Sequence, residues 1–307
     1  MLQLSYFFAV LTALLSPRAV ATTNSPFVVT VHPYGSAWTN YAYEYGETAS
    51  DNAVIFINGL FGGPHTSPFV RRVAEKIHEA QHVSFSVFDI RLRSAFTGFG
   101  MSSLSNDAAD IAVLVEYLRS IGKRKIVLHG HSTGCQDCME YANYNKHHHP
   151  SVDGFILQAT VSDREFLETQ ADYQEKLDFA NALIKEGKSN FCIPRDDPDE
   201  VAMSAYRVHS LYAKGGDDDY FSSDLSNKTV VDFWKRFQKP VMVLLSEKDE
   251  FVQVSKKDQL QRYQEANPEW VSPLSGLIPN ATHSLWEDAA AHDWVAERVV
   301  AFLKTLC

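Results

Sequence analysis

The chain has 307 residues, of which 45% are hydrophobic and 21% are charged, and 28 Lys and Arg residues against 38 Asp and Glu residues give a formal net charge of −10. This length allows one large domain or two small ones, and the apolar fraction excludes a disordered chain. Nucleic-acid binders present a basic face to phosphate, so the acidic balance argues against a nucleic-acid partner.

The N-terminus carries a short apolar run at residues 6–15, followed by the small-x-small tripeptide Ala19-Val20-Ala21. The run is too short to span a membrane, which takes about 20 apolar residues, and the tripeptide is of the kind that a signal peptidase accepts. We therefore expect residues 1–21 to be a signal peptide cleaved after Ala21, with an uncleaved apolar helix as the alternative. The expected product is a secreted protein without stable membrane association. Two N-glycosylation sequons, at Asn227 and Asn280, fit a secretory route.

Hydrophobic periodicity predicts strands that alternate with helices along the rest of the chain. Two aromatic segments are expected to form an opening hairpin, and later strands are continuous apolar runs, typical of strands buried on both faces. Strands are predicted at 27–33, 41–45, 53–57, 83–90, 125–128, 155–159, 241–245 and 276–278, and helices at 67–80, 104–121, 135–145 and 294–306. The alternation predicts the α/β class, with a mostly parallel, doubly wound sheet.

The motif that points to chemistry is Gly-His-Ser-Thr-Gly at 130–134, between a predicted strand and a predicted helix. A G-x-S-x-G turn places its serine at a strained corner, where side chains at Gly130 and Gly134 would clash. The hydroxyl then points into the crevice at the N-terminus of the helix, whose partial positive charge favours a developing oxyanion. Ser132 is therefore the predicted nucleophile, with an ordinary tight turn as the alternative.

A nucleophilic serine needs a base that takes its proton and an acid that orients the base. In folds with this turn the acid follows the serine and the histidine comes last. Asp249 follows the strand at 241–245 and is the predicted acid, with Glu250 as the alternative. His283, in the loop before the last helix, is the predicted base, whereas His292 is expected inside that helix.

An oxyanion hole needs two backbone N–H donors. One is expected from Thr133, directly after the nucleophile. The other is expected from Leu60, with Phe61 as the alternative, in the turn that follows the strand at 53–57. Glycines at positions 59, 62 and 63 would let this turn approach a substrate closely.

The segment at about 163–235 is too long for a plain loop between two strands. We expect it to be a helical cap over the carboxyl edge of the sheet, where open α/β sheets bind ligands. One amphipathic helix is predicted in it, at 166–184, before an acidic stretch at 217–219. Arg91 and Arg93 are expected near the pocket, where they would bind a carboxylate of the substrate; the alternative is that they are surface residues or partners of the cap.

The cysteines and a histidine run are further candidates for chemistry. Cys135 and Cys138 form a C-x-x-C motif inside a predicted helix, so buried thiols, or a bond from one of them to Cys192, are expected rather than a redox or zinc site. The pairing of the four cysteines, with Cys307 as the last, stays open. The histidines at 147–149 could bind a metal weakly, but a solvated loop is the favoured interpretation.

Several segments resemble a fungal α/β-hydrolase family long catalogued as of unknown function, which includes the esterase that opens fusarinine-type siderophores. The matching segments are 96–100, 130–137, 158–159, 161–165 and 216–225, and the similarity extends from about residue 54 to 306. The resemblance implies an α/β-hydrolase domain at 22–307. It assigns the roles of nucleophile, acid and base to Ser132, Asp249 and His283.

The leading hypothesis is a serine esterase that acts on a small-molecule ester or lactone, possible substrates being siderophores or other secondary metabolites. Neither a metal nor an organic cofactor is expected. One alternative is an acyltransferase that passes the acyl group to an alcohol or amine, and another is a ligand-binding receptor on a hydrolase scaffold. Epoxide hydrolases and haloalkane dehalogenases carry Asp at the position of Ser132, so those reactions are disfavoured.

Overall fold

The computed structural model describes residues 26–46, 48–80, 82–195, 198–252, 254–286 and 288–307. The expected signal peptide, residues 1–21, lies outside the described residues, so its cleavage stays a prediction. Within the described ranges, no helix combines the length and the apolar composition needed to cross a membrane.

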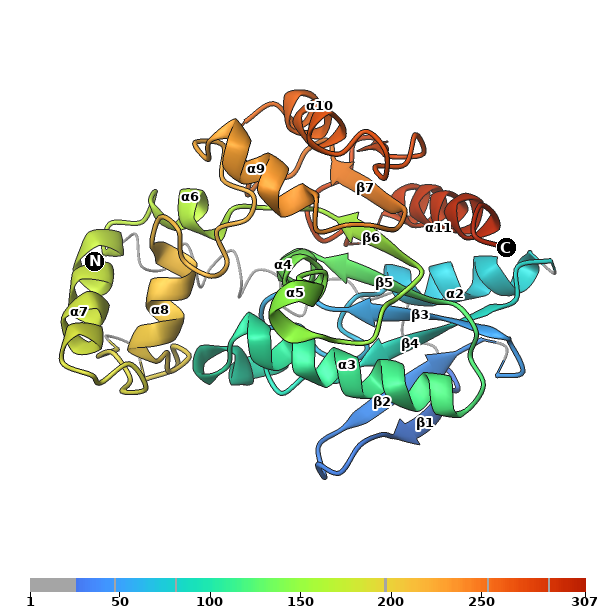
Figure 1. Cartoon of the computed structure of the whole chain (residues 1–307), viewed down its shortest axis with the longest axis horizontal. Helices are drawn as coiled ribbons and strands as arrows, with labels where there is room; N and C mark the ends of the chain where they lie inside the picture. Colours follow the sequence, from blue (N-terminus) through green and yellow to red (C-terminus); the bar gives the residue numbers. More distant parts are fainter. Residues whose placement is uncertain (1–25, 47, 81, 196–197, 253, 287) are drawn as a thin grey trace.

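An eight-stranded sheet forms the centre of the molecule, with the strand order β1-β2-β4-β3-β5-β6-β7-β8 (Figure 1). The strands are β1 (Thr30–Pro33), β2 (Tyr41–Tyr45), β3 (Asn52–Ile57), β4 (Phe85–Ile90), β5 (Ile126–His131), β6 (Gly154–Gln158), β7 (Val241–Ser246) and β8 (Gly276–Ile278). β2 pairs antiparallel with both β1 and β4, and all other neighbours pair in parallel. The predicted hairpin and the mostly parallel sheet are confirmed.

The winding of the sheet reverses at β3, because β4 is added on one side of it and β5 on the other. Ile57 at the end of β3 pairs with Gly130 of β5. Ligands bind outside the carboxyl ends of strands at such a switch point. The turns that follow β3 and β5 therefore lie side by side where a site is expected.

Helices cover both faces of the sheet (Figure 1). α2 (Phe69–Glu79) and α11 (Ala289–Lys304) bury their apolar side chains in one core cluster. The other face is covered by α3 (Leu104–Ser120), α4 (Thr133–Tyr141), α5 (Tyr144–His147), α9 (Asn227–Trp234) and α10 (Lys256–Ala266). Along β3, Ile55 faces this second core while Val54 and Phe56 face the first, which explains the continuous apolar run in the sequence.

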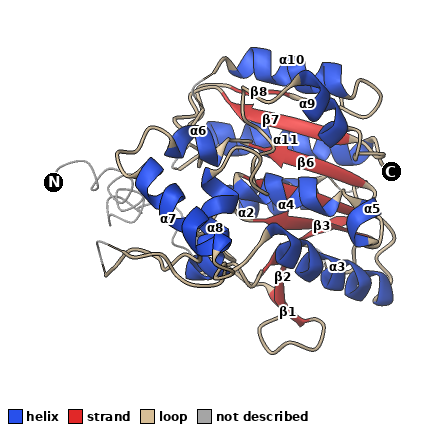
Figure 2. Ribbon diagram, turned by 60° about the vertical axis from the view of Figure 1, so that its left-hand side comes forward, coloured by secondary structure: helices blue, strands red, loops and turns tan. Residues whose placement is uncertain are grey.

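Three helices of the insertion form a cap beside the sheet: α6 (Asp163–Leu167), α7 (Tyr173–Lys185) and α8 (Ala205–Tyr212) (Figure 2). They share a small core of their own, which includes Leu167, Ala180 and Val208. The single helix predicted at 166–184 is wrong, because the chain leaves the helix after Leu167. There the hydroxyl of Thr169 donates to the carbonyl oxygen of Phe166 at 2.7 Å, a local bond that competes with continuation of the helix.

All four cysteines are free thiols. Cys135 and Cys138 are buried in α4, in agreement with the interpretation as buried thiols. They pack in the core between the sheet and the helices α3, α4, α9 and α10. Cys192 is exposed in the cap region, where its sulfur lies 3.7 Å from that of Met101. The considered bond to Cys192 is absent, because α4 belongs to the central core and Cys192 to the cap.

Candidate active site

The turn between β5 and α4 holds Ser132 in a strained conformation, with φ 56° and ψ −125°. Two glycines make the turn possible. A Cβ at position 130 would lie 2.1 Å from the carbonyl oxygen of Gly134, and a Cβ at position 134 would lie 2.3 Å from that of Ile57. The predicted reason for both glycines is therefore confirmed, and the serine sits at the N-terminus of α4.

The structure brings Ser132, His283 and Asp249 together. Nε2 of His283 lies 2.8 Å from Oγ of Ser132, and Nδ1 of His283 lies 2.8 Å from Oδ2 of Asp249. Asp249 is itself fixed, because its Oδ1 accepts the N–H of Phe251 at 3.0 Å. Glu250 contacts the main chain of His283 instead of its ring.

The electrostatic surroundings favour the protonated form of His283. Burial alone would lower the pKa of this imidazole, but the charge and hydrogen bond of Asp249 act against it. The carboxylates of Glu250 and Asp163 add to this effect, so the pKa of His283 is raised above its ordinary value. The ring is thus suited to hold a proton taken from the serine.

The turn after β3 approaches the serine closely. A Cβ at position 59 would lie 2.7 Å from Cβ of Ser132, so Gly59 is needed for this approach. The N–H of Gly62 donates to the carbonyl oxygen of Gly59 at 2.9 Å, which closes a turn over Leu60 and Phe61. Leu60 therefore lies in the segment that faces the serine.

Hydrogen bonds between side chains hold this turn in place. Nδ2 of Asn58 donates to Oδ1 of Asp89 at 2.8 Å, and Oδ1 of Asn58 accepts the hydroxyls of Thr66 and Ser67. Thr133, on the other side of the site, is the first residue of α4. The first N–H groups of a helix have no partner within it, so this backbone donor is available to an oxyanion.

A buried charge network lies between the cap and the central sheet, and the sequence did not predict it. Arg207 of α8 donates to Oδ2 of Asp218 at 2.6 Å, and Ser210 donates to the same oxygen at 2.6 Å. Asp163 accepts the amide of Gln136 at 2.7 Å, and burial raises its pKa to about 7. Charged residues in a sequence usually indicate a solvated surface. Nothing in the sequence therefore indicated that Arg207 and Asp218 are buried.

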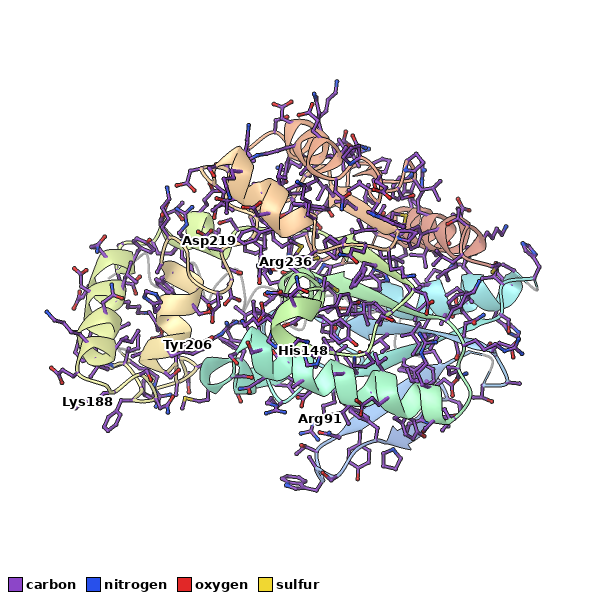
Figure 3. The ribbon with its side chains drawn as sticks, in the orientation of Figure 1. Arg91, His148, Lys188, Tyr206, Asp219 and Arg236 are labelled. Atoms are coloured by element: carbon purple, nitrogen blue, oxygen red, sulfur yellow. The ribbon has the colours of Figure 1, made fainter. Side chains whose placement is uncertain are left out.

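The acidic stretch at 217–219 serves internal contacts of the cap. Asp219 lies 3.4 Å from Nε of Arg164 in α6, and Figure 3 shows it close to that helix. The same arginine pairs with Asp224. Tyr220 donates to Oε2 of Glu140 at 2.7 Å, which fastens the segment to α4. The acidic residues at 217–219 are therefore accounted for by contacts with Tyr206, Arg207 and Arg164 of the cap helices.

Arg93 and His147, from two other sets of candidates, each bond to a carboxylate of the protein. Both nitrogens of Arg93 that face Asp110 donate to its carboxylate, with Nε at 3.0 Å, so this arginine pairs with α3. Arg91 follows β4, and Figure 3 shows it on the side of the sheet where β1 and β2 lie. His147 bonds to Glu140 at 2.6 Å, and no group of three or more potential metal ligands occurs among the described residues.

Comparisons with known proteins place the chain in a family. A family model described as a protein of unknown function, DUF1749, matches residues 19–304. The chain belongs to the DUF1749 family. This DUF1749 chain is 33% identical over 287 residues to the UPF0613 protein PB24D3.06c of Schizosaccharomyces pombe, covering 82% of the chain and 87% of that protein.

Relatives of this DUF1749 chain include esterases. Fusarinine C esterase sidJ of Aspergillus fumigatus is 26% identical over 341 residues, which covers 90% of the chain and 95% of that protein. The structure of the siderophore hydrolase EstB from Aspergillus fumigatus matches with a TM-score of 0.76 at 26% identity, covering 92% of this chain and 98% of that one. The DUF1749 chain has the α/β-hydrolase fold, and the resemblance stated from the sequence is confirmed.

Proposed function

We propose that this protein is a serine esterase that cleaves carboxylic esters or lactones through an acyl-enzyme. The observation that carries the proposal is the unbroken chain of hydrogen bonds from Ser132 through His283 to Asp249, with 2.8 Å at each bond. A serine that is joined to a base, and a base that is joined to an acid, is the arrangement that acyl transfer to serine needs.

In the proposed reaction, Oγ of Ser132 attacks the substrate carbonyl while Nε2 of His283 accepts its proton. Asp249 holds the imidazole in the correct tautomer and stabilises the imidazolium that forms. The backbone N–H groups of Leu60 and Thr133 stabilise the oxyanion. His283 then gives its proton to the leaving alcohol, and a water that it activates releases the acid from Ser132.

The proposed substrate is an ester bond in a siderophore or another secondary metabolite. Fusarinine C esterase sidJ and the siderophore hydrolase EstB, whose names state such activities, align with 90% and 92% of this chain.

Incubation of the purified protein with simple esters, lactones and ferric-siderophore models, followed by mass spectrometry of the products, tests the proposal. We expect the wild type to release acid and alcohol, and Ser132→Ala to lose about 1,000-fold or more in rate. Acyl transfer to an added alcohol or amine in preference to water would identify an acyltransferase. A biological role that survives Ser132→Ala would identify a ligand-binding protein.

We also propose that the chain follows the secretory route. The side chains of both sequon residues, Asn227 and Asn280, are exposed, as glycan attachment requires. Expression in a secreting eukaryotic host and intact-mass measurement before and after glycosidase treatment tests this. Secreted protein with a glycan mass and an N-terminus after Ala21 supports the route, and retention of residues 1–21 in unsecreted protein contradicts it.

A further inference from the structure

His283 is held by four hydrogen bonds from two pairs of adjacent residues. Ser132 and Asp249 bond to its ring, as described above. Their neighbours bond to its main chain: Oε2 of Glu250 accepts its N–H at 2.9 Å, and Nε2 of His131 lies 3.0 Å from its carbonyl oxygen. The main chain of the base is thus fixed from both sides.

On the side of the acid, several bonds join the two loops. The N–H of Glu247 donates to Ile278, and the N–H of Lys248 donates to Ala281 at 2.8 Å. The N–H of Asn280 donates to Oε2 of Glu247 at 2.7 Å. Loss of a single contact there leaves the others in place. On the side of the nucleophile, the link to the main chain of His283 runs through His131.

The protonation state of His131 suits this link. Its ring is buried, and burial is the main cause that lowers its pKa to about 3, with the nearby charge of His283 acting in the same direction. The imidazole is therefore neutral. Since a carbonyl oxygen can only accept, Nε2 of His131 carries the proton. A neutral donor holds His283 without opposing the positive charge that His283 acquires in the reaction.

The geometry points to His131 as a positioning residue: its Nε2–H ties the main chain of the base to the turn that carries the nucleophile, and so fixes the distance between Nε2 of His283 and Oγ of Ser132. This inference rests on the proposed esterase function. It predicts that loss of the donor slows the chemical step while leaving substrate binding in place, because the ring of His131 is buried, with only 6% of the residue exposed.

β5 offers a matched control in His129, two positions upstream on the same strand. It is also buried, its pKa is also lowered, mainly by burial, to about 4, and its Nε2 also makes one hydrogen bond, to Gln158 at 2.9 Å. Both rings contact Phe69. His129 makes no hydrogen bond to His283. Substitution of His129 therefore measures how much stability is lost when a buried imidazole is removed from this strand.

The test compares His131→Met, His131→Gln and His129→Met in thermal unfolding and in steady-state kinetics with a p-nitrophenyl ester. We expect His131→Met to lower kcat about 10- to 100-fold with KM changed less than about threefold. His131→Gln, whose amide nitrogen can take the place of Nε2, should recover most of kcat. His129→Met should lose similar stability and keep kcat. If His131→Met does not fold, His131→Asn, whose shorter amide cannot reach the carbonyl, replaces it.

Equal kcat in His131→Met and His129→Met would overturn the inference. The NMR signal of the Nδ1–H proton of His283 gives a second readout that needs no turnover, and we expect it to shift in His131→Met and not in His129→Met. An inactive wild type would refute the proposed esterase function, and the inference about His131 would then be decided by this signal. An unchanged signal in His131→Met would overturn it.

Discussion

Arg207 of α8 and Asp218 form an ion pair of 2.6 Å in which the two side chains are only 4% and 1% exposed. Ser210 bonds to the same carboxylate oxygen. The pair joins a helix of the cap to the segment that returns to the central core, and it lies near further buried carboxyl groups, Asp107 and Asp163. The charge of the arginine therefore compensates more than one acid.

Replacing Arg207 should destabilise the fold strongly. Arg207→Met leaves Asp218 buried without its partner, and breaking a buried pair in this way costs about 3–5 kcal/mol. Denaturant unfolding of the variant measures the loss. The control is Lys228→Met, which breaks the exposed Lys228–Asp232 pair and should leave the unfolding midpoint unchanged. Equal midpoints in the two variants would show that the buried pair does not contribute as argued.

The charge of Glu250 should set part of the pH profile. Activity depends on neutral His283, so it rises with pH through the pKa of that group. The carboxylate of Glu250 helps to raise this pKa. Glu250→Gln keeps an acceptor for the N–H of His283 and removes the charge, so the acid limb of kcat/KM should move to lower pH.

The control for this shift is Glu247→Gln. Glu247 belongs to the same loop and accepts the N–H of Asn280, but it is not among the main charges that raise the pKa of His283. The acid limb of kcat/KM in Glu247→Gln should therefore coincide with that of the wild type. If the acid limb of kcat/KM in Glu250→Gln stays at the wild-type pH or moves to higher pH, the carboxylate of Glu250 does not raise the pKa of His283.

The close approach of β3 to the serine turn should make Gly134 intolerant of any side chain. In Gly134→Ala the added Cβ meets the carbonyl oxygen of Ile57 at 2.3 Å, and backbone cannot move aside cheaply. We expect a loss of about 1–3 kcal/mol or more in stability and loss of activity. Gly276→Ala, where the nearest atom is 3.8 Å from the added Cβ, is the matched control in thermal unfolding. Comparable stability of the two variants would refute the steric argument.

The convergence of the three candidate side chains was predictable from the sequence because each of them has a local signal. Ser132 stands in a strand–turn–helix motif with two glycines, and Asp249 and His283 follow in the expected order. The sequence also allowed Glu250 as the acid. Only three-dimensional geometry separates the two carboxylates, since one contacts the ring of the base and the other its main chain.

The parts that were not predicted lack such signals. α10 (Lys256–Ala266) is rich in charged and amide side chains, and it buries few apolar groups, Leu260 among them, so its periodicity is weak. At the break after α6 the hydroxyl of Thr169 donates to the carbonyl oxygen of Phe166, and a single threonine is a weak sequence signal for a helix end. The partner of Arg93 is Asp110 on another element, and a pairing between distant residues has no local pattern.

Covalent labelling of the wild type with a fluorophosphonate, followed by peptide mass spectrometry, tests most directly whether Ser132 is an activated nucleophile. We expect one stoichiometric adduct, on Ser132, that is absent in Ser132→Ala and forms slowly in His283→Ala. A wild type that stays unlabelled and turns over no ester, or an adduct on a different residue, would contradict the proposed serine esterase.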